Sequence, residues 1–274
     1  MLNHLPARLL IKSACFTIIM LVVWMGFNEF MPAHIWDGMT ISKSALTVEY
    51  CEFNNPNQFF HQSMNTYSNL AYFFFGVLII QIARIDYKNQ GIKALNRMEQ
   101  FPALSALAGI CFIYLSFGSA FFHASLTYIG QRVDMNGTYS VSITLLSIGF
   151  YQIFHKIHSS DKLKYIWIGS LVVIIIVFLK IALLVSSSVL LPAMILLLTL
   201  INVINYFQFR KERFISIAIL SFALIIIAIK IRTRDVQKID CDPHSFYQGH
   251  AIWHLLTALS SFCSYAFFRF SKLS

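Results

Sequence analysis

The feature that most constrains the fold of this chain is a series of apolar runs, each about 20 residues long, that recur along its whole length. A helix of about 20 residues spans the ~30 Å hydrocarbon core of a bilayer. Backbone groups in lipid must find their hydrogen bonds within the segment, so each run is expected to be helical. Hydrophobic residues make up 57% of the 274 residues and charged residues 12%, and the mean hydropathy is +0.66. These values exclude an ordinary soluble domain.

Eight such runs are predicted to be transmembrane helices, so the chain is predicted to be an all-α polytopic membrane bundle. The runs are Leu9–Phe27, Asn65–Ala83, Phe101–Phe122, Met135–Phe154, Tyr165–Leu184, Val189–Phe207, Phe214–Ile231 and His250–Phe268. Little more than the turn Ser186–Ser188 separates the fifth run from the sixth. The first run follows Arg8 and Lys12, but no small-x-small cleavage site comes after it, which favours an uncleaved anchor over a signal peptide.

Basic residues set the predicted orientation of the bundle. The net charge of +9 is concentrated in loops 84–97, 156–164 and 210–213 and near both termini, which fall on one side if eight helices alternate. By the positive-inside rule this side, with both termini, is cytoplasmic. The charge is therefore assigned to topology and not to nucleic-acid binding. The loop before the last run is an exception, because Arg232, Arg234 and Lys238 fall on the opposite side, together with three aspartates.

With this orientation the conspicuous polar residues converge on the outer face. Ser119 and His123 lie at the outer end of the third run, Asp134 opens the fourth, and His250 and His254 open the eighth. A spacing of four places two histidines on one helical face, and three imidazoles with an open fourth position are typical of catalytic zinc. A nearby aspartate can accept a proton and a serine can stabilise an oxyanion, which together indicate metal-assisted hydrolysis. The alternatives are structural: boundary histidines, a helix cap and a helix-packing serine.

Three segments of the sequence resemble the alkaline ceramidase family. The segment GSAFFHASLTYIGQRVDM is similar to the motif G-S-x-x-F-H-x-x-L-x-x-x-x-Q-x-x-D, and HAIWH to H-x-x-x-H. Upstream, EYCEFN followed by NTYSNL resembles D-W-C-E-x-N and N-T-x-S-N-L. The three occur in the family's order between Glu49 and Phe268. The wider superfamily includes the progestin/adiponectin receptors and GPI-remodelling membrane proteins.

The resemblance implies a zinc-dependent amidohydrolase that cleaves ceramide or a related N-acyl lipid to a fatty acid and an amine. It implies that His123, His250 and His254 hold zinc, that Asp134 activates the attacking water, and that Ser119 helps to stabilise the oxyanion. It also implies a seven-helix domain over residues 49–274, so that residues 1–48 form an additional N-terminal helix and outer loop. A membrane lipid is the expected partner, and no obligate protein partner is evident.

A calcium site in the first outer loop is also implied, built from Glu49, the Tyr50 carbonyl, Glu52 and Asn54. The sequence departs from the family here, because the family has Asp and Trp where Glu49 and Tyr50 stand. It also has Gln62 where the family has a further ligating Glu. Loss of a carboxylate weakens a calcium site, so an acidic loop packed over the zinc centre without an ion is the alternative.

Two of the five cysteines, Cys51 and Cys241, fall in predicted outer loops, whereas Cys15, Cys111 and Cys263 lie in apolar runs. Outer loops face an oxidising compartment in the case of an ER lumen or a periplasm. We therefore predict a Cys51–Cys241 disulfide, comparable to a link in the family between the N-terminal segment and a later loop. Free thiols are the alternative.

Two other classes of function remain open. A receptor-like or lipid-binding protein of the same superfamily would retain zinc without turnover, and a transporter or channel would use intramembrane His and Asp residues to move ions. The presence of both Asp134 and Ser119 favours hydrolysis over lipid binding. The clustering of polar residues at one face, with no charge in the middle of the apolar runs, disfavours a transport pathway.

Overall fold

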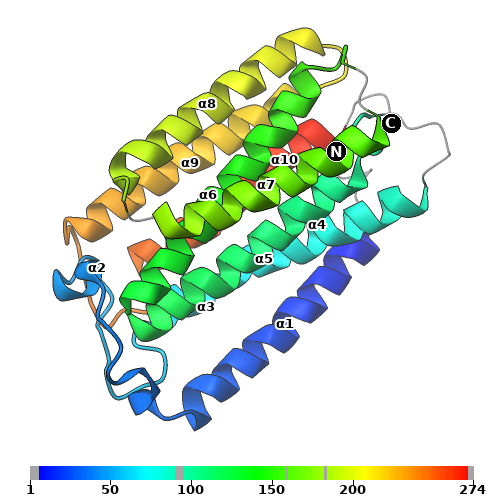
Figure 1. Cartoon of the computed structure of the whole chain (residues 1–274). Coiled ribbons are helices and arrows are strands. Elements are labelled where there is room, and N and C mark those ends of the chain that lie inside the picture. Colours follow the sequence, from blue (N-terminus) through cyan, green and yellow to red (C-terminus); the bar gives the residue numbers. More distant parts are fainter. Residues whose placement is uncertain (1–5, 90–95, 158–159, 182–183, 271–274) are drawn as a thin grey trace.

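The chain folds into a bundle of long helices (Figure 1). The computed structural model describes residues 6–89, 96–157, 160–181 and 184–270. The long helices are α1 (Ala7–Phe30), α4 (Leu70–Lys88), α5 (Pro102–Ser125), α6 (Tyr128–Ile153), α7 (Asp161–Ile181), α8 (Ser187–Gln208), α9 (Ile215–Val236) and α10 (Gly249–Arg269). The short ones are η2 (Ala33–Trp36), α2 (Lys43–Leu46) and α3 (Ser63–Ser68).

Each predicted run coincides with a helix, and the all-α membrane bundle is confirmed. Within the described residues, seven spans are long and apolar enough to cross a bilayer, with α3 and α4 counted together as one. The eighth, α6, is 26 residues long but begins with a polar stretch. Residues 90–95 and 158–159 in two predicted cytoplasmic loops lie outside the described residues, as do residues 1–5, 182–183 and 271–274.

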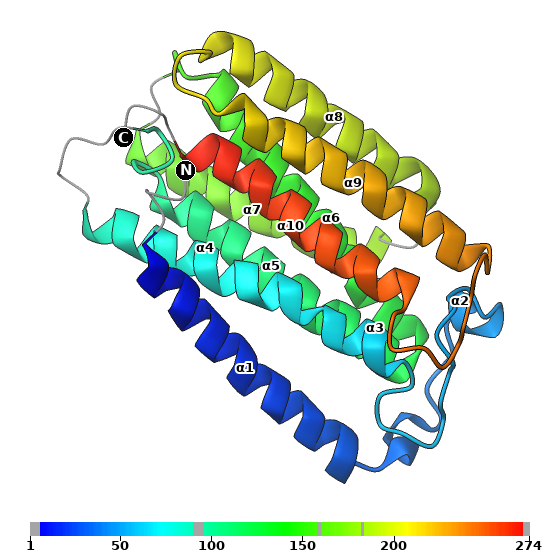
Figure 2. The ribbon, with the colours of Figure 1, turned by 180° about the vertical axis from the view of Figure 1, so that it is seen from behind.

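The helices alternate in direction, so that one end of the bundle gathers the outer loops (Figures 1 and 2). At this end, called the site end below, α1, α5 and α9 finish, and α3, α6 and α10 begin. α1 begins and α10 finishes at the opposite, distal end. This arrangement is the alternation on which the predicted orientation depends, while the membrane side that each end faces stays a prediction.

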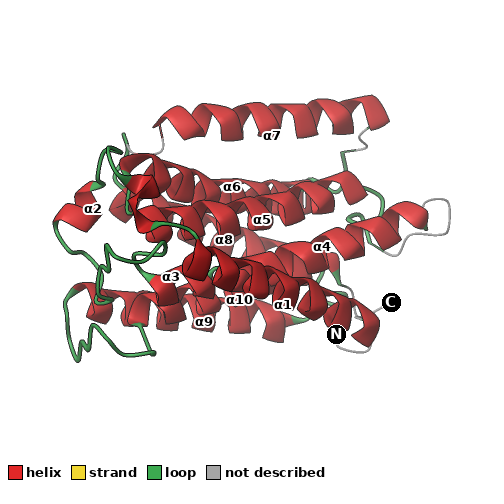
Figure 3. Ribbon diagram, turned by 90° about the horizontal axis from the view of Figure 1, so that it is seen from below, coloured by secondary structure: helices red, strands yellow, loops and turns green. Residues whose placement is uncertain are grey.

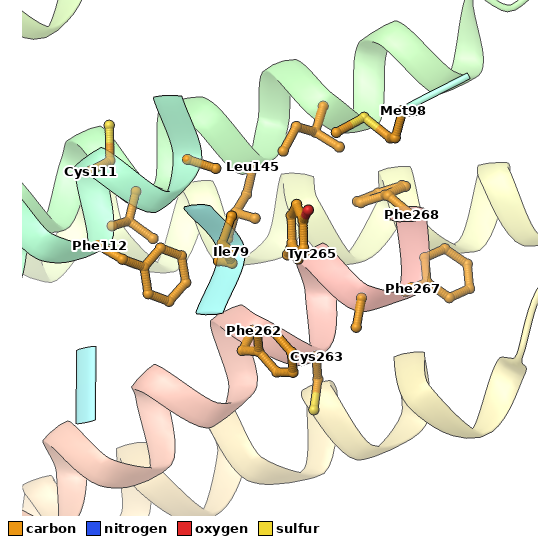
Figure 4. Packing of buried hydrophobic residues seen from close by; sticks show 14 of the residues in the cluster. Ile79, Met98, Cys111, Phe112, Leu145, Phe262, Cys263, Tyr265, Phe267 and Phe268 are labelled. Carbon is orange, nitrogen blue, oxygen red and sulfur yellow. The ribbon is translucent and has the colours of Figure 1, made fainter. Parts of the chain in front are cut away.

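Small residues allow the central helices to approach closely. A Cβ atom at Gly76 of α4 would lie 2.8 Å from the carbonyl oxygen of Gly109 on α5, and one at Gly109 would lie 2.9 Å from the carbonyl oxygen of Gly76. Contacts between small residues are the usual means by which membrane helices associate. Toward the distal end the core is filled by large side chains such as Phe112, Tyr265 and Phe268 (Figure 4).

α7 and α1 lie at the periphery of the bundle. α7 stands at its edge (Figure 3), and Leu171 is its buried residue among those described. α1 packs on α4, where Gln81 Nε2 donates to Ser13 Oγ at 2.7 Å. The remaining surfaces of both helices expose apolar side chains such as Ile18 and Ile176, as expected for contact with lipid.

The connection between α5 and α6 differs from the prediction. Leu126 adopts a left-handed conformation (φ 52°) that ends α5, and the Thr127 hydroxyl caps α6 by accepting from Gly130 N at 3.1 Å. α6 therefore begins seven residues before the apolar run, and Asp134 lies inside the helix instead of opening it. Hydropathy located the apolar part of α6, whereas the capping residue determines where the helix begins.

Candidate functional site

Three histidines from two helices meet at the site end. His123 lies in the last turn of α5, and His250 and His254 lie in the first two turns of α10. One ring nitrogen from each is within 4.8 Å of the others, and the side chains are 0%, 4% and 4% exposed. Among the described residues this is the one group of three or more His, Cys, Asp or Glu side chains with spacing suitable for a metal ion.

The hydrogen bonds of these rings fit a metal centre. Nε2 of His123 and Nδ1 of His250 are buried without a hydrogen-bond partner, a state that costs about 1–3 kcal/mol for each buried polar group. In contrast, Nδ1 of His123 lies 2.7 Å from Gln62 Oε1, and Nδ1 of His254 lies 2.7 Å from Ser68 Oγ. Metal-binding histidines usually have one nitrogen held by the protein and the other directed at the ion. Three imidazoles are a donor set suited to zinc.

Ser119 and Asp134 lie beside the histidines. Ser119 is one turn before His123 on α5, and its side chain lies beside the Asp134 carboxylate on α6. The two helices come close here, because a Cβ at Gly118 would lie 3.0 Å from Val133 Cγ1. The structure thus brings together all five residues that the sequence selected for zinc binding and catalysis.

A cavity of about 720 Å³ extends from this centre toward the distal end. Asp134, Ser119, His250 and His254 line it at the site end, while His123 is fully buried behind them. Toward the distal end its walls are mainly apolar and come from α6, α8, α9 and α10. Although α8 and α9 both line the cavity, α8 packs chiefly on α6 and α9 on α10, so the two helices contact each other little.

Tyr50, in the first outer loop, packs against the histidine cluster. Its ring stacks on His250 with centroids 3.9 Å apart. Burial, and then the charge of Glu49, raises the pKa of the Tyr50 phenol above its ordinary value, so the group stays protonated at neutral pH. The prediction concerned only the carbonyl of this residue and missed the role of its ring.

The first two groups of the predicted calcium site have partners within the protein. The Glu49 carboxylate pairs with Arg232 at 3.1 Å and lines the cavity, and the Tyr50 carbonyl accepts a hydrogen bond from the Lys238 ammonium. Two cations of the chain therefore occupy oxygens that were assigned to calcium. These contacts also explain the basic loop that departs from the positive-inside pattern, since two of its charges bind the first outer loop.

The other two groups are also engaged. The Glu52 carboxylate accepts from the backbone N–H groups of Met64 at 2.6 Å and Asn65 at 2.8 Å, and Asn54 Oδ1 accepts from Gln62 Nε2 at 2.7 Å. Burial raises the pKa of Glu52 to about 7 despite these hydrogen bonds, so the carboxyl is only partly ionised at neutral pH. The four groups do not fit a preformed calcium site, because an ion would have to displace these partners.

The outer loops are fastened to each other above the centre. Cys51 and Cys241 form the predicted disulfide, with Cα atoms 5.7 Å apart. The buried Asp235 carboxylate accepts from the backbone N–H of Cys51 and from that of His250, both at 3.2 Å. Asp235 thus joins the first outer loop to the start of α10. Sequence reasoning missed it, because it counted only as one of three acidic residues in a basic loop.

Comparison with known protein families gives one result that covers most of the chain. A sequence profile of the family described as Ceramidase matches residues 42–274. The match begins in the first outer loop, so α1 precedes it. Searches of curated proteins and of solved structures give no significant match.

Proposed function

The chain belongs to the ceramidase family of ceramide-hydrolysing membrane enzymes, and from this membership we propose that it is a zinc-dependent amide hydrolase. Its substrate is ceramide or a related N-acyl lipid, and its products are a fatty acid and an amine. One observation carries the proposal: buried imidazoles with unpaired nitrogens share the end of a long, mainly apolar cavity with a serine–aspartate pair.

His123, His250 and His254 would hold the zinc ion. When bound there, zinc supplies a Lewis acid that polarises the amide carbonyl and lowers the pKa of water. Asp134 and Ser119 line the cavity beside these histidines, where they would act on a substrate held next to the ion.

Asp134 is proposed to be the general base and then the general acid. Its carboxylate accepts a proton from the water as the water oxygen bonds to the amide carbon, and it returns that proton to the nitrogen as the C–N bond breaks. The amine therefore leaves as a neutral group and the fatty acid takes up the hydroxyl. The Ser119 hydroxyl, which lies beside Asp134, is proposed to donate a hydrogen bond to the developing oxyanion.

The cavity has the length and lining that an acyl chain requires. Ile215 and Arg232 both line it and are separated along α9 by roughly 25 Å, at 1.5 Å of helix per residue. We infer that the acyl chain of the lipid enters the cavity from the membrane between α8 and α9, because these two helices contact each other little. At the site end, Arg232 lies 5.7 Å from the Trp253 ring and borders the position of the polar part of the lipid.

We further propose that the site end faces the extracytoplasmic side and that both termini are cytoplasmic. The Cys51–Cys241 disulfide lies at the site end, and disulfides persist in oxidising compartments, which supports this orientation in addition to the positive-inside pattern. In this arrangement α1 is an additional helix packed on a seven-helix catalytic domain over residues 49–274.

Lipid mass spectrometry with purified protein tests the proposal. Wild type and Asp134→Ala would be incubated with ceramide, and the fatty acid and amine released would be quantified together with bound zinc. Asp161→Ala is a matched control, because that carboxylate lies exposed on α7. Release by wild type and by the control, but not by Asp134→Ala, supports the proposal. Zinc binding without release would instead indicate a lipid-binding protein of the same superfamily.

A further inference from the structure

We propose that Gln62 is a positioning residue that holds His123 in the tautomer required for zinc binding. The inference rests on the proposed function, because it concerns a ligand of the same metal centre. The sequence assigned this position to the outer-loop calcium site, whereas the structure gives the Gln62 side chain a direct contact with a zinc ligand.

Gln62 contacts His123 through both its backbone and its side chain. Its backbone N–H donates to the His123 carbonyl at 3.0 Å, and its Oε1 lies 2.7 Å from His123 Nδ1. The side chain is 2% exposed and the histidine 0%. Water therefore does not compete for this hydrogen bond, and Gln62 is the one partner of His123 Nδ1 among the described residues.

Two neighbouring asparagines hydrogen-bond the Gln62 amide in the orientation that the structure gives it. Gln62 Nε2 donates to Asn54 Oδ1 at 2.7 Å, and Asn65 Nδ2 donates to Gln62 Oε1 at 3.1 Å. In this orientation the atom that faces His123 is Oε1, an oxygen, which can only accept. It follows that Nδ1 of His123 carries the hydrogen.

The position of the hydrogen on the His123 ring determines which ring nitrogen can bind a metal ion. A neutral imidazole with hydrogen on Nδ1 has its lone pair on Nε2. Nε2 is the atom of His123 that is buried without a partner. Gln62 thus directs the free lone pair of His123 at the cluster formed with His250 and His254. Losing such an outer partner typically weakens metal affinity by 10- to 100-fold.

The same amide connects the metal centre to the outer loop. Asn54, which accepts from Gln62 Nε2, follows Cys51 of the disulfide by three residues. The loop therefore holds Gln62 from one side while Gln62 holds His123 on the other. No cation is required for this connection, because every contact in it is a hydrogen bond between residues of the chain.

Two variants separate positioning from mere packing. Gln62→Met keeps the approximate size and removes the acceptor, and we expect zinc affinity to fall 10- to 100-fold in competition with a chelator. Gln62→Glu keeps an oxygen toward Nδ1 and is expected to retain affinity within about threefold of wild type, far from the loss caused by removing the partner. Asn57→Ala, at an exposed position of the same loop, is the matched control and is expected to bind zinc like wild type.

A spectroscopic measurement on the wild-type protein does not depend on whether a variant folds. In metal-free protein with ¹⁵N-labelled histidine, NMR is expected to show His123 with hydrogen on Nδ1, assigned by comparison with His123→Ala. Hydrogen on Nε2, or unchanged zinc affinity in Gln62→Met, would overturn the inference while leaving the zinc enzyme intact. A wild-type protein that binds no zinc would overturn the proposed function and this inference with it.

Discussion

Replacement of Asp134 by asparagine is the change that separates the proposed chemistry from the fold. Asparagine has nearly the same shape as aspartate, and its Oδ1 can accept a hydrogen bond from the neighbouring Ser119 hydroxyl. Asparagine fills the same space beside the substrate cavity, so the substitution creates no additional void. It also leaves no cation unpaired, because the nearby Arg232 pairs with Glu49. We therefore expect Asp134→Asn to fold and to bind zinc like wild type.

The expected loss of rate follows from proton transfer, which the asparagine side chain cannot perform. An asparagine side chain does not accept a proton at neutral pH, so water must attack without a base. Positioned general acid–base groups contribute about 10²- to 10⁴-fold to rate, which corresponds to about 3–5 kcal/mol of activation free energy. Because the cavity walls are unchanged, most of this loss should appear in kcat and little in KM.

Initial rates of fatty acid release in detergent micelles measure this prediction. The rates would be compared for wild type, Asp134→Asn and the surface control Asp161→Asn, with zinc content and apparent unfolding temperature recorded for each. A kcat of Asp134→Asn within about threefold of wild type, with zinc retained, would refute the assignment of Asp134 as the proton acceptor.

Three further predictions concern the cavity, the disulfide and calcium. Ala218→Phe, which fills the cavity wall on α9, should reduce turnover of long-chain amides at least about tenfold but spare short-chain ones, and an unchanged chain-length profile would contradict the proposed acyl cavity. The double variant Cys51→Ser/Cys241→Ser should lose about 2–4 kcal/mol of stability and unfold at a lower temperature, whereas unfolding at the wild-type temperature would show that the link is dispensable. Calcium in excess over EGTA should leave the unfolding temperature unchanged, because the loop oxygens already have partners. A ligand present at ~100 times its Kd stabilises a protein by about 2.7 kcal/mol. A clear rise in unfolding temperature would therefore reveal a calcium site and contradict this prediction.

Much of the bundle and its candidate centre could be predicted because both depend on simple periodicities. Apolar runs of membrane-spanning length located the helices, and the alternation of basic loops placed His123 at the same end as His250 and His254. The four-residue spacing of His250 and His254 placed both side chains on one face of a helix. The Cys51–Cys241 pairing followed from the same alternation, since both residues lie in loops of that end.

The remaining features depend on contacts between segments that are far apart in the sequence. The start of α6 is determined by Thr127 and a left-handed Leu126, which hydropathy does not reveal. Asp235 and Lys238 looked like members of a mixed-charge loop, yet each hydrogen-bonds the first outer loop, nearly 190 residues away. Gln62 was aligned with a calcium ligand, and only the packed loop brings its amide to the His123 ring.

The most direct test of the central claim is ceramide hydrolysis by the purified wild-type protein before and after removal of zinc with a strong chelator. Elemental analysis would verify that the metal has been removed, and zinc would then be restored. The account predicts release of fatty acid by the zinc-loaded protein, loss of that activity with the metal, and recovery on addition of zinc. Full activity in protein verified to contain no metal would contradict it.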